Sequence, residues 1–476
     1  MIFKNGVHRT YTYQNSSGNN ETFPWTEVQI LRGLQENVDV MFLLICGFFI
    51  FFMKAGFAFL EAGAVRRKSV VNSLFRNFMD LYICGTAYWL FGYGLAFGNT
   101  GNPFVGHDPR YFALAWVSTT EYAMWFFQMV FGEAAGTIMS GAVAERANSL
   151  GYIVANFMVT GFVYPIVTHW VWSPDGWLIN GDGVVGFTDF AGSGCVHVVG
   201  GACALVASLF VGPRMGRFDH NGASQELKGH NLPFTALGAL ILFFGFLAFN
   251  AGSQKSISQP GDGAIVGRAV VNTVVAACSG GWALTFLVKI KEKRWSLMQG
   301  LNGALAGMVA ICAGCASMHP WAGCCTGIIA GFVYYFYSQV TPRVRIDDPV
   351  DAIALHLGGG SWGVMAYAIF ADDGILLNWS KESFLILGWQ TAGLVAITAW
   401  SMGVTALIFA VLKLLGLGVV SQEKQLLGQD VRVHRESGYG EDDLYSSRSS
   451  LISHSQAEDG EPGGRPRSDS IVSDLA

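Results

Sequence analysis

The sequence predicts an all-α membrane protein that crosses the bilayer many times. Of its 476 residues, 51% are hydrophobic and only 13% are charged, whereas a soluble chain of this length carries about a quarter charged residues. Sixty glycines are spread through long apolar runs, a composition that suits helices whose backbones approach closely in lipid. A transmembrane β-barrel is disfavoured because its strands would alternate apolar and polar residues, whereas these runs are continuous.

The apolar runs divide the chain into three parts. Residues 1–37 form a polar arm that lacks the apolar core of a signal peptide. A spanning helix needs about 20 predominantly apolar residues. Eleven runs approach that requirement: 38–62, 76–98, 121–143, 150–172, 189–212, 232–252, 265–289, 297–316, 320–340, 352–371 and 385–416. The predicted domains are therefore an arm at 1–37, a transmembrane domain at 38–420 and a polar, serine-rich tail at 421–476 that is expected to be largely disordered.

Basic residues in the connections predict the orientation. If the N-terminus lies outside, the inside connections hold 13 basic residues: Arg66, Arg67, Lys68, Arg146, Arg214, Arg217, Lys228, Lys289, Lys291, Lys293, Arg294, Arg343 and Arg345. The outside connections then hold four: Arg110, Lys255, Arg268 and Lys381. The positive-inside rule therefore places the N-terminus outside and the tail in the cytoplasm. Glycosylation sequons at Asn15, Asn20 and Asn378 fall on the outside in this arrangement.

Eleven spans divide into five, five and one. Because five is odd, a second block of five enters the membrane the other way up, which is the inverted repeat of many transporters. A faint echo supports this division: Asp189 precedes His197 by eight residues at the fifth span, and Asp348 precedes His356 by eight at the tenth. We therefore expect a 5+5 inverted repeat followed by a final helix.

The two histidines are the strongest candidates for function. A histidine is costly in lipid, so His197 and His356 should face the protein interior or a cavity. For a single histidine the simpler interpretation is a core residue bonded to a backbone carbonyl, but a symmetric pair makes that interpretation weaker. Two facing neutral imidazoles share one hydrogen bond, line a narrow path, and can take up and release a proton near physiological pH. This chemistry suits a small solute that can lose a proton, or a proton relay.

Other chemistries find less support. Two histidines without carboxylate or thiolate partners do not complete a metal site, and no hydrolase motif is present. The nine cysteines lie in or at the ends of apolar runs, where small packing residues are a better interpretation than disulfides or a Cys312–Cys315 metal site. No basic tract indicates nucleic acid. We expect neither an enzyme nor a metal or other cofactor.

Aromatic residues gather near the outside ends of three predicted spans. Phe127 and Phe131 are one helical turn apart, Trp172 ends the fourth span, and Phe249 and Ser253 are one turn apart in the sixth. Aromatic faces attract cations by about 2 kcal/mol or more when the cation is desolvated, and a serine oxygen accepts one N–H bond. The alternative for each residue alone is an interfacial aromatic belt. Together they predict an outer vestibule for a small cation.

Five long motifs carry a family resemblance. The segments DFAGSGCVHVVGG, GAVAER, PIVTHWVW, HNLPFTALGALILFFGFLAFNAGS and DDPVDAIALH, in this order, closely resemble the ammonium transporter (Amt) family over roughly residues 38 to 440. Within the ammonium transporter/Rhesus superfamily the chain resembles the Amt branch, because Rhesus glycoproteins generally lack this tryptophan and serine. The resemblance implies a homotrimer of eleven-helix subunits with one pore in each subunit.

The resemblance also implies roles for particular residues. Phe127, Phe131, Trp172 and Ser253 match the outer ammonium site, Phe131 and Phe249 the stacked gate, His197 and His356 the twin-histidine pore, and Asp189 the aspartate that orders the outer vestibule. Asp189 also reads as a helix N-cap. Asn302 and Cys312 depart from the family, because some members carry hydroxyl residues there.

The function expected from this sequence is ammonium transport across the plasma membrane. Ammonium binds at the outer site and loses a proton, and ammonia passes the two histidines, with or without the proton. Methylammonium is expected as a second substrate because it keeps N–H donors and a similar size. Two alternatives stay open: an ammonium sensor or receptor whose long tail signals, and an electroneutral ammonia gas channel.

Overall fold

The computed structural model describes residues 10–14, 20–24 and 27–439, and this part of the chain is nearly all helical. Two short antiparallel strands, β1 (Thr10–Gln14) and β2 (Asn20–Pro24), precede the first helix. The sequon at Asn15 and the serine-rich part of the predicted tail, residues 440–476, lie outside the described residues.

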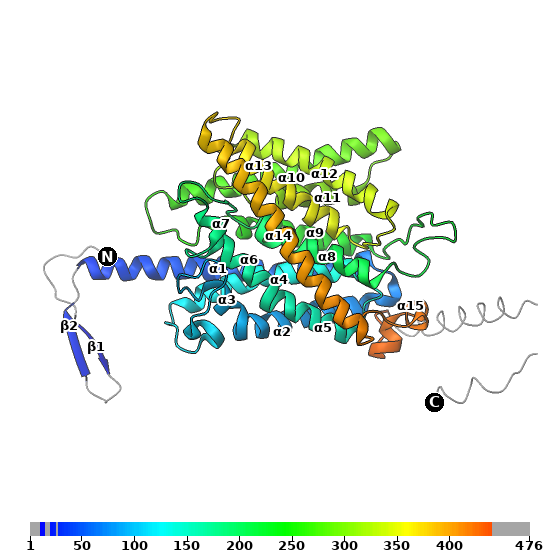
Figure 1. Ribbon diagram of the computed structural model, residues 1–476, viewed down its shortest axis with the longest axis horizontal. Helices are drawn as coiled ribbons and strands as arrows, with labels where there is room; N and C mark the ends of the chain where they lie inside the picture. The colour runs from blue at the N-terminus through cyan, green and yellow to red at the C-terminus, as the bar shows by residue number, and fades with distance from the viewer. Residues whose placement is uncertain (1–9, 15–19, 25–26, 440–476) are drawn as a thin grey trace, which may run out of the picture.

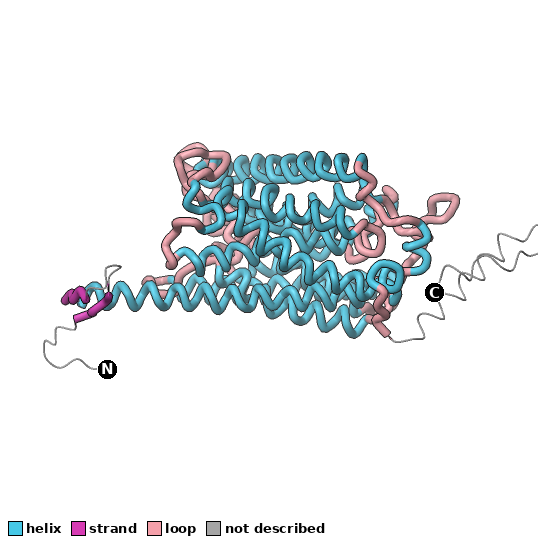
Figure 2. Tube along the Cα trace, turned by 90° about the horizontal axis from the view of Figure 1, so that it is seen from below, coloured by secondary structure: helices cyan, strands magenta, loops and turns pink. Residues whose placement is uncertain are grey.

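Long helices run side by side and loops gather at both ends of the bundle (Figures 1 and 2). We call the end at which α1 begins the hairpin end, and the opposite end, which carries α15, the tail end. The first half contains α1 (Glu27–Ala64), η1 (Arg67–Ser69), α2 (Val70–Ala87), η2 (Tyr88–Gly92), α3 (Tyr93–Phe97), η3 (Pro109–Leu114), α4 (Glu121–Ala142), α5 (Ser149–Met158), η4 (Val159–Val163), α6 (Tyr164–Trp172), α7 (Trp177–Asn180), η5 (Ser193–Val198) and α8 (Val199–Val211).

The second half of the described chain is also helical. It contains α9 (Leu232–Gly252), α10 (Asp262–Glu292), α11 (Leu297–Ile311), α12 (Pro320–Arg343), η6 (Ile353–Gly358), α13 (Gly359–Phe370), α14 (Lys381–Leu414), α15 (Gln422–Leu427) and η7 (Asp430–His434). Helix α1 packs on α9, α4 packs on α8, and α10 packs on α11 and α12. Helix α14 runs diagonally across the face seen in Figure 1.

The predicted fold class is confirmed as a helical bundle with membrane-spanning character. Each of the eleven predicted ranges overlaps a helix or a continuous run of helical turns, although residues 189–192 and 312–316 lie outside helices. Among the described residues, seven such segments are long and apolar enough to cross a membrane, and α11 is apolar but shorter. The number of eleven crossings and the inverted repeat stay predictions.

Several helix starts differ from the sequence prediction by four residues or more, and two of them have a clear physical reason. Helix α1 begins at Glu27 rather than near Val38, because a helix can continue through polar residues that an apolar count leaves out. The fifth predicted range begins at Asp189, but helical turns begin only at Ser193. Gly192 has a left-handed backbone with φ of 102°, which glycine adopts without steric cost, so the chain turns sharply before η5.

Close backbone approach brings the two histidine-bearing segments together. A Cβ atom at Gly201 in α8 would lie only 2.2 Å from the Leu357 backbone nitrogen, and one at Gly360 would lie 2.5 Å from the Ser193 carbonyl oxygen. A side chain at either position would push η5 and η6 apart. Glycine at these two positions therefore sets the distance between the two halves at the centre of the bundle.

Candidate functional site

Three aromatic side chains form one cluster towards the hairpin end. Phe127 and Phe131 lie one turn apart on α4, are almost fully buried, and have ring centroids 4.9 Å apart. The Trp172 ring meets the Phe131 ring edge-on, with centroids 5.7 Å apart at an interplanar angle of 87°. Trp172 is the last residue of α6, and its indole N–H donates to the Asp189 carbonyl oxygen at 2.7 Å. The structure therefore brings these predicted site residues together.

Ser253 follows directly after α9 and is buried beside the same cluster. Its hydroxyl donates to the Phe249 carbonyl oxygen at 2.9 Å. The preceding residue touches the cluster closely, since a Cβ at Gly252 would lie 2.9 Å from a Phe127 ring carbon. Because the hydroxyl proton is used, the Ser253 oxygen keeps its lone pairs to accept a bond from another donor.

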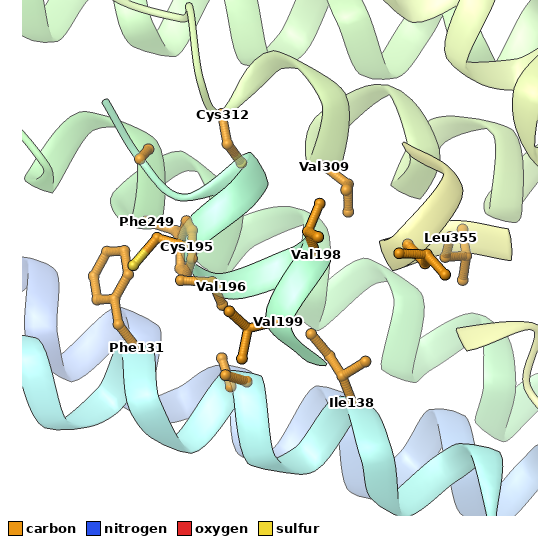
Figure 3. Close-up of a cluster of buried hydrophobic side chains, with 14 of the residues drawn as sticks. Phe131, Ile138, Cys195, Val196, Val198, Val199, Phe249, Val309, Cys312 and Leu355 are labelled. Atoms are coloured by element: carbon orange, nitrogen blue, oxygen red, sulfur yellow. The ribbon is translucent and has the colours of Figure 1, made fainter. Parts of the chain in front are cut away.

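Phe131 and Phe249 stack on one another, as predicted for a gate. Their ring centroids are 4.1 Å apart and the rings are inclined by 26°. Figure 3 shows the two rings side by side, one from α4 and one from α9. Both rings are almost completely buried, so the stack closes the space between the aromatic cluster and the residues beyond it.

The two histidines meet directly behind the phenylalanine stack. The His197 and His356 rings are stacked with centroids 5.1 Å apart, and their Nδ1 atoms are 3.2 Å apart. The His197 ring also stacks against Phe249 at 5.6 Å. Phe131, Phe249, His197 and His356 thus form one continuous series of rings. The predicted contact of the two imidazoles is present, with one nitrogen donating and the other accepting.

Each histidine lies in a turn of π-helix. His197 belongs to η5 and His356 belongs to η6, and each π-turn leads into a regular α-helix. Single π-turns inside helices are rare and occur frequently at functional sites. The two halves of the chain therefore place their histidines with the same local backbone, a symmetry that the spacing of eight residues from Asp189 and Asp348 had indicated.

Cys312 contacts His197 and favours one tautomer of the pair. Its Sγ lies 3.6 Å from His197 Nε2, while its thiol donates to the Met308 carbonyl oxygen at 3.1 Å. Since the thiol proton is used, the sulfur accepts from His197 Nε2–H. His197 Nδ1 is then the acceptor in the pair, and His356 Nδ1–H is the donor. The sequence singled out Cys312 only as a departure from the family, and its contact with His197 depends on how α11 packs.

Asp189 is a helix cap whose two oxygens are fully used. Oδ1 accepts from the backbone N–H groups of Gly192 and Ser193 at 2.9 and 2.8 Å, and Oδ2 accepts from Gly194 and Cys195, both at 2.8 Å. The predicted capping role is therefore present in the geometry. Since Trp172 bonds the Asp189 carbonyl, one residue holds both the indole and the start of η5.

Asp348 occupies the corresponding place in the second half, but its carboxylate accepts fewer hydrogen bonds than that of Asp189. Asp348 Oδ2 accepts from the Ile353 backbone N–H at 2.7 Å, whereas the buried Oδ1 has no hydrogen-bond partner. Burial and the nearby Asp351 carboxylate raise the pKa of Asp348 to about 7. Asp189 and Asp348 thus precede their histidines at the same spacing but differ in the number of bonds they accept.

Sequence reasoning missed a group of buried charges on the first helices. Lys54 in α1 pairs with Asp80 in α2 at 2.9 Å and with Glu133 in α4 at 2.8 Å. Glu61 in α1 is also buried. The signal was present, because charged residues inside a predicted span are expensive and mark function or pairing. Among the described residues, no group of three or more His, Cys, Asp or Glu side chains is arranged to hold a metal ion.

Comparison with known proteins identifies the family. Residues 41–439 match the model of the Ammonium Transporter Family. Putative ammonium transporter 1 of Caenorhabditis elegans is 43% identical over 432 residues, covering 86% of this chain and 80% of that protein. Ammonium transporter Amt2 of Archaeoglobus fulgidus is 36% identical over 427 residues, covering 85% of this chain and 90% of that one.

Solved structures show the same fold. One described as "Sensor Amt Protein" has 33% sequence identity and a TM-score of 0.78, and the match covers 84% of this chain and 99% of that one. The crystal structure of Candida albicans Mep2 has 26% identity and a TM-score of 0.74, covering 84% and 89%. Taken with the motifs, these matches show that the chain belongs to the ammonium transporter family.

Proposed function

We propose that this protein transports ammonium across the plasma membrane, with the hairpin end outside and the tail end in the cytoplasm. The observation that carries the proposal is the series of rings from Phe131 through Phe249 to His197 and His356, which begins at an aromatic cluster. The relatives named as ammonium transporters support the substrate class.

Ammonium binds first at the hairpin side of the stack, between Phe127, Phe131, Trp172 and Ser253. The aromatic faces offset part of the lost hydration through cation–π contact, about 2 kcal/mol or more in a desolvated site. The Ser253 oxygen accepts one N–H bond, because its own proton is donated to Phe249. Potassium has no N–H to donate, so the same site discriminates against it.

Neutral ammonia then passes the stack and the histidines. The stacked phenylalanine rings, 4.1 Å apart, leave no room for a hydrated ion, so passage requires ring movement and favours the neutral form. The imidazole edges supply hydrogen-bond partners in an otherwise apolar path. A proton released from ammonium can travel along the His197–His356 hydrogen bond, whose Nδ1 atoms are 3.2 Å apart.

Topology and assembly follow the same proposal. Eleven crossings in a 5+5 inverted repeat with a final helix place the basic connections inside, and Asn378 is exposed just ahead of α14, where a glycan outside the cell could attach. The assembly is proposed to be a homotrimer in a lipid bilayer with one pore per subunit, and methylammonium to be a second substrate.

The test is labelled methylammonium uptake and ammonium-evoked current in the same oocytes expressing the full chain. We expect methylammonium uptake to saturate, and we expect potassium to evoke no comparable current. His197→Asn and His356→Asn are expected to reduce it strongly, whereas His220→Asn, at an exposed position, serves as the control.

Other outcomes separate the alternatives. Binding of ammonium at the cell surface without uptake or current would overturn transport in favour of a sensor. Uptake without saturation or outer-site dependence would favour a gas channel. Unchanged uptake in both histidine variants would contradict the twin-histidine pore.

A further inference from the structure

Five buried charged side chains lie on α1, α2 and α4, and three of them, Lys54, Asp80 and Glu133, are joined by ion pairs. Lys54 pairs with Asp80 and Glu133, and its Nζ also donates to the Thr137 hydroxyl at 2.7 Å. Asp80 further accepts from Tyr152 and Asn156. Ions that are paired and fully hydrogen-bonded in this way serve the packing of α1, α2 and α4.

Glu61, two turns further along α1, is different. Its Oε2 accepts from Asn77 Nδ2 at 2.9 Å, from the Ser73 hydroxyl at 3.2 Å and from the Ser140 hydroxyl at 3.4 Å. All three donors are neutral. Within the described ranges of the chain, no ion pair includes Glu61, although only 2% of the residue is exposed.

The second oxygen of Glu61 lies beside a cavity. Oε1 is 3.4 Å from the position of a Cβ atom at Gly141, and Glu61 and Gly141 both line a small cavity of about 30 Å³. His356 and Thr137 line the same cavity, and its remaining walls are apolar residues such as Phe246. A volume of this size admits one or two water-sized molecules.

The cavity therefore joins the histidine pair to a carboxylate. His356 uses Nδ1 in its bond to His197, so Nε2 is the ring nitrogen available on the other side. Glu61 has one oxygen bound by three neutral donors and the other available. Burial disfavours the charged form of a carboxylate, and the three donors that bind Glu61 are neutral, so Glu61 binds a proton more readily than a carboxylate in water does. This is the property required of a proton acceptor.

We propose that Glu61 accepts the proton at the tail side of the histidine pair and passes it towards the cytoplasm. This inference rests on the proposed ammonium transport. The relay requires the two rings first to exchange tautomers, so that His197 Nδ1–H donates to His356 Nδ1. Ammonium then gives its proton to His197 Nε2, the Nδ1 proton of His197 moves to His356 Nδ1, and both rings are left in the tautomer that Cys312 accepts from once His356 Nε2–H has given its proton to a water molecule in the cavity. That water passes a proton to the Glu61 carboxylate, which becomes a carboxylic acid. Loss of that proton to cytoplasmic water restores the carboxylate. No electrons move, and both imidazoles return to neutrality.

The test compares Glu61→Gln with Glu133→Gln in the full chain. Both substitutions remove one buried carboxylate of the same size, but Glu133 does not line the cavity. The readout is charge moved per labelled methylammonium, measured in the same cells. Glu61→Gln is expected to lower this ratio about tenfold or more, with the half-saturating concentration unchanged within about twofold. Glu61→Asp, which keeps a carboxylate, is expected to restore part of the ratio.

A structural defect would lower current and uptake together and leave their ratio unchanged. A normal ratio in Glu61→Gln, or equal loss of the ratio in both variants, overturns the role of Glu61. Uptake without current in the unaltered protein also overturns it but leaves the proposed transport standing. Neither uptake nor current in the unaltered protein, with the chain at the cell surface, overturns the proposed function itself.

Discussion

Two buried carboxylates flank the series of rings, and they are used in opposite ways. Asp189, near the hairpin end, accepts four backbone N–H bonds with its two oxygens. Glu61, towards the tail end, accepts three bonds on one oxygen and presents the other beside a cavity shared with His356. Both are almost fully buried. The difference indicates that the bonding of each oxygen, rather than burial, decides whether a carboxylate supports the fold or exchanges protons.

The largest effect is expected from Asp189→Ala, which tests the structural side of this comparison. The substitution leaves four buried N–H groups unpaired, and each costs about 1–3 kcal/mol. We expect a loss of about 4 kcal/mol or more, seen as loss of monodisperse protein in detergent and of its thermal transition. Asp182→Ala is the control, because that exposed carboxylate also accepts two backbone bonds, from Val184 and Val185. Equal melting temperatures for the two variants would show that Asp189 does not stabilise the fold through these four bonds.

Asp347 is a third buried carboxylate, and its partners are charged arginine side chains. It binds the Arg214 guanidinium at 2.8 and 3.0 Å and Arg217 at 3.2 Å. Asp347→Ala removes one of the two carboxylates paired with the buried Arg214, whose ion pair with Glu145 stays, and is expected to cost about 3 kcal/mol in thermal unfolding. Asp372→Ala, which breaks the exposed pair with Arg268, is expected to cost at most about 1 kcal/mol. Similar losses in the two variants would contradict the importance of burial.

The same residue predicts a pH dependence. Burial raises the pKa of Asp347, but hydrogen bonds from Arg214 and the charges of Arg146 and Arg214 outweigh it and lower the pKa to about 2 from the ordinary 3.8. The folded state thus binds this proton less readily than the unfolded state. Its stabilisation is present above pH 3.8 and is lost as the pH falls towards 2. If the melting temperature of Asp347→Asn fell between pH 3.8 and 2 as much as that of the unaltered protein, Asp347 would not be the source of this pH dependence.

A smaller effect on stability separates Glu61→Gln from Asp189→Asn. Glutamine keeps an oxygen for Asn77 and Ser73, so we expect a loss below about 1 kcal/mol. Asparagine at position 189 would turn an NH₂ donor towards two backbone N–H donors, at a cost of about 2 kcal/mol or more. Thermal melting of the two purified variants measures this difference. A greater loss for Glu61→Gln would make Glu61 a structural residue.

The smallest effect is expected at Cys312. Cys312→Ala removes the acceptor for His197 Nε2–H, whose bond is worth about one kcal/mol, and is expected to lower current about threefold. Cys312→Ser keeps an acceptor and is expected to retain the current. The exposed Cys278→Ala is the control. Equal currents in Cys312→Ala and the control would show that Cys312 does not influence the His197 tautomer.

Much of the fold was predictable because lipid requires long apolar runs. The eleven ranges overlap helical segments, and the motifs named the ring series that the structure brings together. The start of η5 was misplaced, since the capping by Asp189 and the left-handed Gly192 interrupt an apolar run without changing its composition.

The contacts between distant segments were not predictable from spacing. Glu61 lies in α1 and His356 in η6, and only the packing of the bundle places both beside one cavity. Cys312 reaches His197 for the same reason. The charges at Lys54, Asp80 and Glu133 were visible inside apolar runs, but which of them pair, and that Glu61 stays outside the ion pairs, depends on side-chain geometry.

The most direct test of the central claim is the charge moved per methylammonium by the purified full chain in proteoliposomes, with and without Glu61→Gln. We expect a saturable flux that excess potassium does not inhibit, with about one charge per methylammonium. In the variant we expect the ratio to fall while uptake persists. Absence of any methylammonium flux from folded protein would contradict transport along the histidine pair. An unchanged ratio in the variant would contradict the asymmetry between Asp189 and Glu61.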